Sequence, residues 1–103
     1  MNNIFDAIPK SASTEIFETL IESEDIKIER IISRGHVTPD PGWYDQDKNE
    51  WVIVLKGEAL LVFADGTSLN LKTGDYINIA AHKKHRVDWT DPDTETIWLA
   101  VHY

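Results

Sequence analysis

The second half of this chain is a succession of short apolar runs separated by turn residues. Residues 51–55 are apolar throughout, Gly57 ends this run, and a return run follows at 59–63. Asp65-Gly66 is a hairpin signal, because a tight hairpin turn needs residues that tolerate positive φ. Further strand-length runs cover 68–71, 76–79, 85–90 and 96–103. Short strands at such regular spacing predict an all-β barrel or sandwich.

The first half of the chain is less regular. Residues 26–32 alternate as a strand does. Residues 15–22 have apolar side chains at helical spacing, but the Ser-Glu-Asp turn at 23–25 suits a hairpin, and a strand is the preferred prediction. Residues 33–49 are rich in Gly, Pro and Asp, which predicts a long loop. Loops of this length in small domains are often functional.

Length and composition limit the class of protein. A chain of 103 residues predicts one domain, with N-terminal strands in 1–33 and a barrel core in 34–103. The absence of cysteine excludes disulfides and thiolate ligands. No apolar run approaches the roughly 20 residues that span a bilayer, so we expect no membrane association. The first residues lack the pattern of a secretory signal, and we expect a cytoplasmic protein.

The charge of the chain is strongly acidic. A formal net charge of −8 opposes a phosphate backbone, so nucleic acid is not expected as a partner. Lys83, Lys84 and Arg86 nevertheless surround His82 and His85. This basic cluster is either a solvated turn balanced by nearby aspartates or an electrostatic lip that draws an anionic small molecule to a site.

Alternation of side chains predicts which residues of the run 85–90 point inward. His85 shares one face with Val87 and Trp89, and this face is apolar. We therefore expect His85 and Trp89 to face the interior of the barrel. A lone inward histidine is often only a hydrogen-bonded core residue, but neutral imidazole is also the commonest metal ligand among side chains.

A second set of polar residues precedes the strand at 51–55. Tyr44, Gln46 and Glu50 have the same parity as the apolar Val52, so they are expected to face inward with it. Glu50 is then a candidate ligand or general base, with Gln46 and Tyr44 beside it. The alternative for Glu50 is a strand-entry residue paired with a lysine or with Arg34.

The opposite face of the same strand is also apolar. Trp51, Ile53 and Leu55 would expose a large hydrophobic patch if nothing covered them. The N-terminal strands could cover this face, from the same chain or from a partner. We therefore expect a homodimer with an apolar interface that involves the N-terminal half.

Two segments carry a motif. Glu50 is followed by six residues and Gly57, and Gly74 is followed by ten residues and His85. These segments resemble the two motifs of the cupin superfamily in their spacing. The resemblance implies an all-β, double-stranded β-helix (jelly-roll) cupin barrel, similar to small single-domain cupins whose first motif is degenerate.

The motifs are incomplete in this chain. Tyr44 and Gln46 stand where the first motif has two histidines, and His82 stands where the second motif has glycine. The resemblance implies a divalent metal held by three histidines and the glutamate. Glu50 and His85 are the two ligands that remain, with Gln46 as a third candidate and His82 as a weaker one.

Three functions remain open on the sequence alone. The first is a site in the barrel for a divalent metal, for a small molecule, or for both, with an anionic molecule as one candidate. The second is a metal-free enzyme in which Glu50 and His85 act as an acid/base pair for isomerisation or hydrolysis. The third is a non-catalytic ligand-binding or sensing module. Tyr44, Gln46 and Trp89 are the predicted substrate-binding residues. No organic cofactor is expected, and His36 and His102 are expected to be structural.

Overall fold

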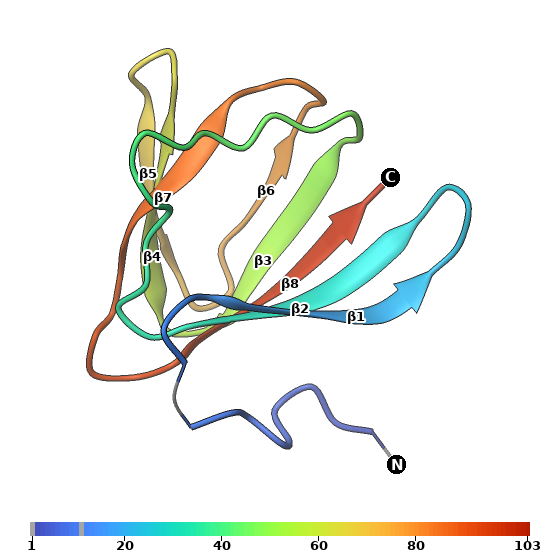
Figure 1. Ribbon diagram of the computed structural model, residues 1–103, viewed down its shortest axis with the longest axis vertical. Coiled ribbons are helices and arrows are strands. Elements are labelled where there is room, and N and C mark those ends of the chain that lie inside the picture. The colour runs from blue at the N-terminus through green and yellow to red at the C-terminus, as the bar shows by residue number, and fades with distance from the viewer. Residues whose placement is uncertain (1, 11) are drawn as a thin grey trace.

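Strands form all the regular structure that the computed structural model describes, which comprises residues 2–10 and 12–103 (Figure 1). The strand preferred over a helix for residues 15–22 is confirmed, and it begins at Ile16. The strands are β1 (Ile16–Glu22), β2 (Lys27–Ser33), β3 (Glu50–Lys56), β4 (Glu58–Phe63), β5 (Ser68–Lys72), β6 (Tyr76–Ile79), β7 (His85–Thr90) and β8 (Thr96–His102). The predicted all-β fold is confirmed. The described residues include no helix long and apolar enough to cross a membrane.

The strands form two antiparallel sheets that enclose one interior. A five-stranded sheet has the order β1-β2-β8-β3-β6, and a three-stranded sheet has the order β5-β4-β7. In Figure 1 the smaller sheet stands opposite the larger one, and the long loop between β2 and β3 passes along the rim of the barrel. In the larger sheet β8 pairs with β2 and with β3, which are distant in the sequence, so neighbouring residues of the interior come from both halves of the chain.

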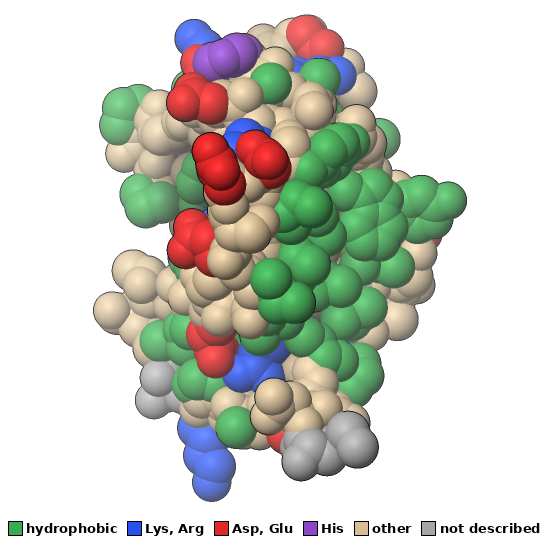
Figure 2. All heavy atoms as spheres, turned by 90° about the vertical axis from the view of Figure 1, so that its right-hand side faces the viewer, with side chains coloured by type: hydrophobic (Ala, Val, Ile, Leu, Met, Phe, Trp, Pro, Cys, Tyr) green, Lys and Arg blue, Asp and Glu red, His purple; other side chains and the backbone are tan. Residues whose placement is uncertain are grey.

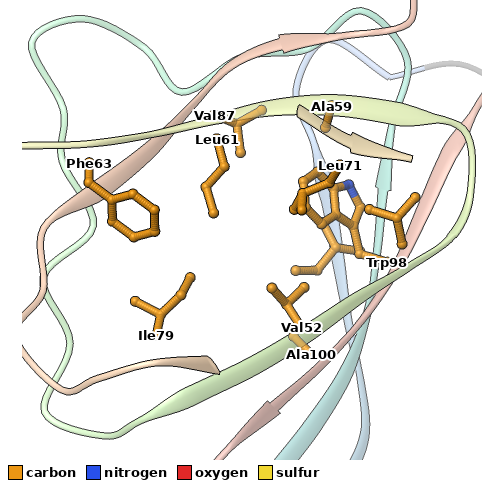
Figure 3. Close-up of a cluster of buried hydrophobic side chains, with 11 residues drawn as sticks. Val52, Ala59, Leu61, Phe63, Leu71, Ile79, Val87, Trp98 and Ala100 are labelled. Atoms are coloured by element: carbon orange, nitrogen blue, oxygen red, sulfur yellow. The ribbon is translucent and has the colours of Figure 1, made fainter. Parts of the chain in front are cut away.

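The interior is packed by apolar side chains from both sheets (Figure 3). Val54 and Ala59 are fully buried, and Leu61 and Phe63 are nearly so. Burying a side chain of this size stabilises the fold by roughly 1.5–3 kcal/mol relative to exposure. The buried residues occupy alternate positions of β3 and β4, because successive side chains of a strand point to opposite faces.

The register of β7 changes halfway along the strand. Val87 pairs with Leu61, but Trp89 pairs with Leu60, so Asp88 is an extra residue that forms a bulge. A bulge of one residue reverses the faces of all side chains beyond it. His85 and Val87 point inward as predicted, whereas Trp89 lies on the outer face and is 40% exposed. The prediction that Trp89 faces the interior, and with it the predicted ligand contact, is wrong for this reason.

The outer face of the larger sheet is apolar over several strands. Trp51 and Ile53 of β3 lie beside Val101 and Leu99 of β8 on this face. The N-terminal strands join the edge of the same sheet instead of covering this face, contrary to one of the expected arrangements. Figure 2 shows a broad hydrophobic area on this side of the molecule. The homodimer that this face suggested stays a prediction.

Candidate functional site

A cavity of ≈ 90 Å³ lies between the two sheets. By the same measure a single water molecule needs about 10–15 Å³, so the cavity has room for several waters or a small organic molecule. Apolar side chains form most of its wall, including Val52, Leu61 and Trp98. The polar side chains that line it are Glu15, Glu29, Tyr44, Gln46, Glu50, His85 and His102.

Glu50 and His85 meet in this cavity, as the alternation of their strands predicted. Glu50 opens β3 and His85 opens β7, and both side chains are buried. Glu50 Oε1 is 3.3 Å from His85 Nε2 and accepts a hydrogen bond of 2.9 Å from Gln46 Nε2. Three of the predicted site residues are therefore in direct contact within a largely apolar wall.

The backbone determines which nitrogen of His85 carries a hydrogen. His85 Nδ1 is 2.9 Å from the carbonyl oxygen of Lys83. A carbonyl oxygen can only accept, so Nδ1 carries the hydrogen and Nε2 faces Glu50. A proton between Nε2 and Oε1 relieves the repulsion between two lone pairs. The pair is thus arranged to share one proton.

Glu50 is held in its ionised form. Burial by itself would raise the pKa of Glu50, but the hydrogen bonds from His85 and Gln46 outweigh burial, and nearby His102 adds to their effect. The pKa of Glu50 is therefore lowered. Both described contacts use Oε1, and no described side chain donates to Oε2. Oε2 is the atom that remains for a ligand in the cavity.

Tyr44 reaches the cavity because the loop at 34–49 is tied to β7. Tyr44 and His85 exchange backbone hydrogen bonds of 2.8 and 3.1 Å, and their rings lie 5.6 Å apart. Arg86 anchors the same loop by donating to the carbonyl oxygens of Thr38 and Gly42. Burial, followed by the charge of Glu15, raises the pKa of Tyr44, so its hydroxyl stays protonated at neutral pH.

A second imidazole–carboxylate pair, formed by His102 and Glu29, lines the cavity and was not expected. His102 Nε2 is 2.8 Å from Glu29 Oε1, although the two residues are 73 positions apart. His102 stands directly opposite Glu50 in the pairing of β3 with β8. His102 shares parity with Trp98 and Ala100, a signal that could have placed it on the inner face. The expectation that His102 is only structural misses its place in the cavity wall.

Glu15 is a third carboxyl group in the wall. It precedes β1, and its Oε2 lies 2.5 Å from Ser33 Oγ. Trp98 Nε1 donates to the same Ser33 oxygen at 3.3 Å, so the Ser33 hydroxyl is free to donate its hydrogen to Glu15. Burial raises the pKa of Glu15, more than the hydrogen bond from Ser33 lowers it. No sequence signal singled out Glu15 in advance.

The basic cluster around the turn before β7 does not line the cavity. His82 is exposed, and its Nδ1 lies 2.9 Å from Asp45 Oδ1. Its φ of 64° lies in the left-handed region, which glycine adopts most easily, and the motif has glycine at this position. Lys83 lies over the ring of Phe63, and Arg86 is occupied by the loop described above and by Asp88. These contacts favour the solvated turn over the electrostatic lip, and His82 is separated from the Glu50–His85 pair.

The contact between His102 and Glu29 predicts how the stability of the protein depends on pH. The hydrogen bond to Glu29 raises the pKa of His102, and Glu50 contributes further. The stabilising effect is complete below the usual histidine pKa of about 6.5 and is lost as pH rises through the raised value. We expect His102→Gln to destabilise the protein more at about pH 6 than at about pH 9, because glutamine keeps only a neutral hydrogen bond. Urea unfolding at both values measures this difference. A difference that stays constant or grows with pH would contradict the assigned pair.

The side chains at the motif positions are a poor set of ligands for the divalent metal that the resemblance to cupins implies. Among the residues that the structure describes, no group of three His, Asp or Glu side chains is placed to hold a metal ion. Tyr44 and Gln46 occupy the two histidine positions of the motif, and both are weak ligands beside imidazole and carboxylate. Gln46 presents its amide NH₂ to Glu50, and His82 points away from the cavity. We therefore derive no chemistry here from a bound metal.

The family model described as a cupin domain matches residues 33–102. A crystal structure of a candidate mannose-6-phosphate isomerase from Ralstonia eutropha JMP134 is 43% identical, with a TM-score of 0.93, and the match covers 99% of this chain and 95% of that chain. A cupin superfamily protein from Desulfitobacterium hafniense DCB-2 is 19% identical, with a TM-score of 0.76 and coverage of 92% and 82%.

A further structure shows the same architecture. The RmlC-like cupin from Methanocaldococcus jannaschii, described as having a double-stranded β-helix fold, is 22% identical, with a TM-score of 0.72 and coverage of 92% and 84%. No curated protein matches the sequence. The family match spans well over half of the chain and includes Glu50, Gly57, Gly74 and His85. The chain therefore belongs to the cupin family, with the double-stranded β-helix fold.

Proposed function

We propose that this protein binds a small carbonyl compound in the barrel and catalyses an isomerisation by transferring a proton on it. The observation that carries the proposal is the buried Glu50–His85 pair at 3.3 Å, with Glu50 Oε2 left without a described partner at the cavity. A carboxylate held in an apolar wall and kept ionised by its neighbours is suited to act as a general base.

The geometry assigns a role to each residue of the site. Glu50 Oε2 removes a proton from the carbon next to the carbonyl, and the electron pair moves to the carbonyl oxygen as an enolate. The protonated Tyr44 hydroxyl is available to donate to that oxygen. His85 Nε2 shares the proton with Glu50 and stabilises its charge. In an α-hydroxy carbonyl compound, the proton of the α-hydroxyl group then moves to the former carbonyl oxygen, which makes the α-carbon the new carbonyl carbon. Return of the abstracted proton from Glu50 to the former carbonyl carbon gives the isomeric hydroxycarbonyl compound.

The comparisons favour an isomerase over a hydrolase. The relative with 43% identity is named as a candidate mannose-6-phosphate isomerase, which is a reaction of this class. Its name supports the type of chemistry proposed for this chain and leaves the substrate open. A cavity of ≈ 90 Å³ accommodates compounds of a few carbons more readily than a hexose phosphate.

Deuterium exchange at carbon tests the proposal directly. We expect the protein, in deuterium oxide, to exchange the hydrogen next to the carbonyl in at least one member of a panel of three-carbon hydroxy- and aminocarbonyl compounds. Glu50→Gln should slow this exchange by about 10²- to 10⁴-fold, the usual contribution of a general base. Proton NMR follows the loss of the carbon-bound hydrogen signal.

Two controls separate the site from other causes. His82→Gln changes an exposed histidine outside the cavity and should leave the exchange rate unchanged. Dialysis against a chelator should also leave it unchanged, because the described ligand set is poor. Full exchange by the Glu50→Gln variant would refute the proposed mechanism. A requirement for added metal in the exchange reaction would refute it as well. Binding without any exchange across the panel would favour a ligand-binding module.

A further inference from the structure

We propose that the ligand of this cavity is a small organic cation, such as a protonated amine, and that the cavity rejects anions such as sugar phosphates. This inference rests on the proposed binding of a small molecule in the barrel and specifies its charge. It opposes the anionic ligand that the basic cluster in the sequence suggested, because that cluster lies outside the cavity.

The charges that line the cavity favour a cation. Three carboxyl groups line it, from Glu15, Glu29 and Glu50, together with two imidazoles and no lysine or arginine. Each imidazole already faces a carboxylate, His85 with Glu50 at 3.3 Å and His102 with Glu29 at 2.8 Å. One carboxyl group, that of Glu15, is left without a basic partner in the cavity wall.

Glu15 is placed so that a ligand can supply the missing positive charge. Its hydrogen-bond partner is the neutral hydroxyl of Ser33, which is itself held by Trp98 Nε1. Burial raises the pKa of Glu15 by more than the hydrogen bond from Ser33 and the nearby His36 lower it, so ionisation of Glu15 in the cavity wall is unfavourable. A charged amine beside Glu15 would offset that cost. The apolar wall strengthens the attraction, because the local dielectric constant is lower than in water.

Two lysines lie beside the cavity without lining it. Lys27 and Lys48 line a separate outer depression that shares Glu29 and His102 with the cavity. Lys27 Nζ is 3.7 Å from Glu29 Oε2, and Lys48 Nζ donates to the carbonyl oxygen of Glu24 at 3.2 Å. Neither lysine lines the cavity. An anion that entered the barrel would therefore find no lysine or arginine in the cavity wall to bind it.

Three probes with one carbon skeleton test the charge preference. Serinol carries an ammonium group, glycerol is neutral, and glycerate carries a carboxylate. We expect serinol to bind the intact protein about tenfold or more tightly than glycerol at neutral pH, and glycerate to bind more weakly than both. Titrations followed by two-dimensional amide NMR spectra give each dissociation constant and show whether residues of the cavity wall respond.

A charge-removing variant locates the preference. Glu15→Gln keeps the size of the side chain and should reduce the advantage of serinol over glycerol to less than about threefold. Glu22→Gln removes an exposed carboxylate at the end of β1 and should leave the advantage intact. A binding preference that survives Glu15→Gln overturns the assignment to Glu15.

Other results overturn the proposal as a whole. Glycerol or glycerate binding as tightly as serinol would show that the cavity does not select a cation. Failure of all three probes to bind would count equally against it, because the cavity has room for a small organic molecule. These outcomes are independent of catalysis. A preference for serinol without deuterium exchange would refute the proposed isomerase but support the proposed cation preference. Exchange restricted to anionic compounds would support the isomerase and refute the cation preference.

Discussion

Replacing Gly57 with alanine is expected to destabilise the protein by about 3–5 kcal/mol. Gly57 has a φ of 92°, a conformation that costs other residues energy, and it lies against the start of β8. An added Cβ would lie 2.7 Å from Thr96 Cα and 2.9 Å from Thr96 Cβ, and it would also clash with Thr96 Oγ1. Because the Cα belongs to the backbone of a buried strand, this neighbour cannot move away at low cost.

Gly74→Ala is the matched control for this prediction. Gly74 has a nearly identical φ of 93°, but an added Cβ meets no atom within 4 Å. We expect only the backbone cost, about 1 kcal/mol. Urea unfolding of the two variants beside the unmodified protein measures both changes. Equal destabilisation by the two substitutions would show that packing against Thr96 adds nothing, and would contradict the close approach of Gly57 to β8.

Trp98→Ala should cost about 3–5 kcal/mol of unfolding free energy, the usual range for removing a large buried aromatic side chain. Trp98 is 3% exposed and belongs both to the core cluster and to the cavity wall. Its removal enlarges the cavity and also deletes the hydrogen bond to Ser33 that supports Glu15. We therefore expect the variant to lose stability and the charge preference of the cavity together.

Trp89→Ala provides the comparison for Trp98, because the two residue types are the same and both lie on strands. Trp89 is 40% exposed on the outer face, beyond the bulge at Asp88. We expect a loss of about 1 kcal/mol or less and no effect on ligand binding. Chemical unfolding with intrinsic fluorescence and the probe titrations measure both quantities. A large loss of stability or altered binding for Trp89→Ala would mean that β7 continues without the bulge.

Local signals in the sequence predict much of the fold. Turn residues separate the strands, and continuous apolar runs mark β3 and β4, whose burial alternates in the structure. The spacing of Glu50 to Gly57 and of Gly74 to His85 identifies the family. The same alternation predicts that Glu50 and His85 point inward, because each opens a strand whose inner face is apolar. These features depend on residues close together in the chain, so local physics suffices to predict them.

The remaining half of the site depends on contacts between distant residues. His102 and Glu29 meet because β2 and β8 pair. Glu15 is held at the cavity by a hydrogen bond from Ser33, whose oxygen accepts a hydrogen bond from Trp98. No local pattern states which strands will pair. The role expected for Trp89 was wrong for a related reason. The bulge at Asp88 has no clear signature in the sequence, but it reverses which side chains of β7 face inward beyond it.

The sequence by itself therefore determined the strands, the barrel family and the inward placing of Glu50 and His85, because strand alternation and turn residues act over a few positions. Only the tertiary structure decided the charge of the cavity. The carboxyl groups of Glu15, Glu29 and Glu50 come from three separate segments of the chain. Two basic residues that lie next to His85 in the sequence have other contacts: Lys83 lies over the ring of Phe63, and Arg86 donates hydrogen bonds to the loop at 34–49. Which charges share a cavity is settled by strand pairing across the whole chain, and that pairing is not encoded in any short segment.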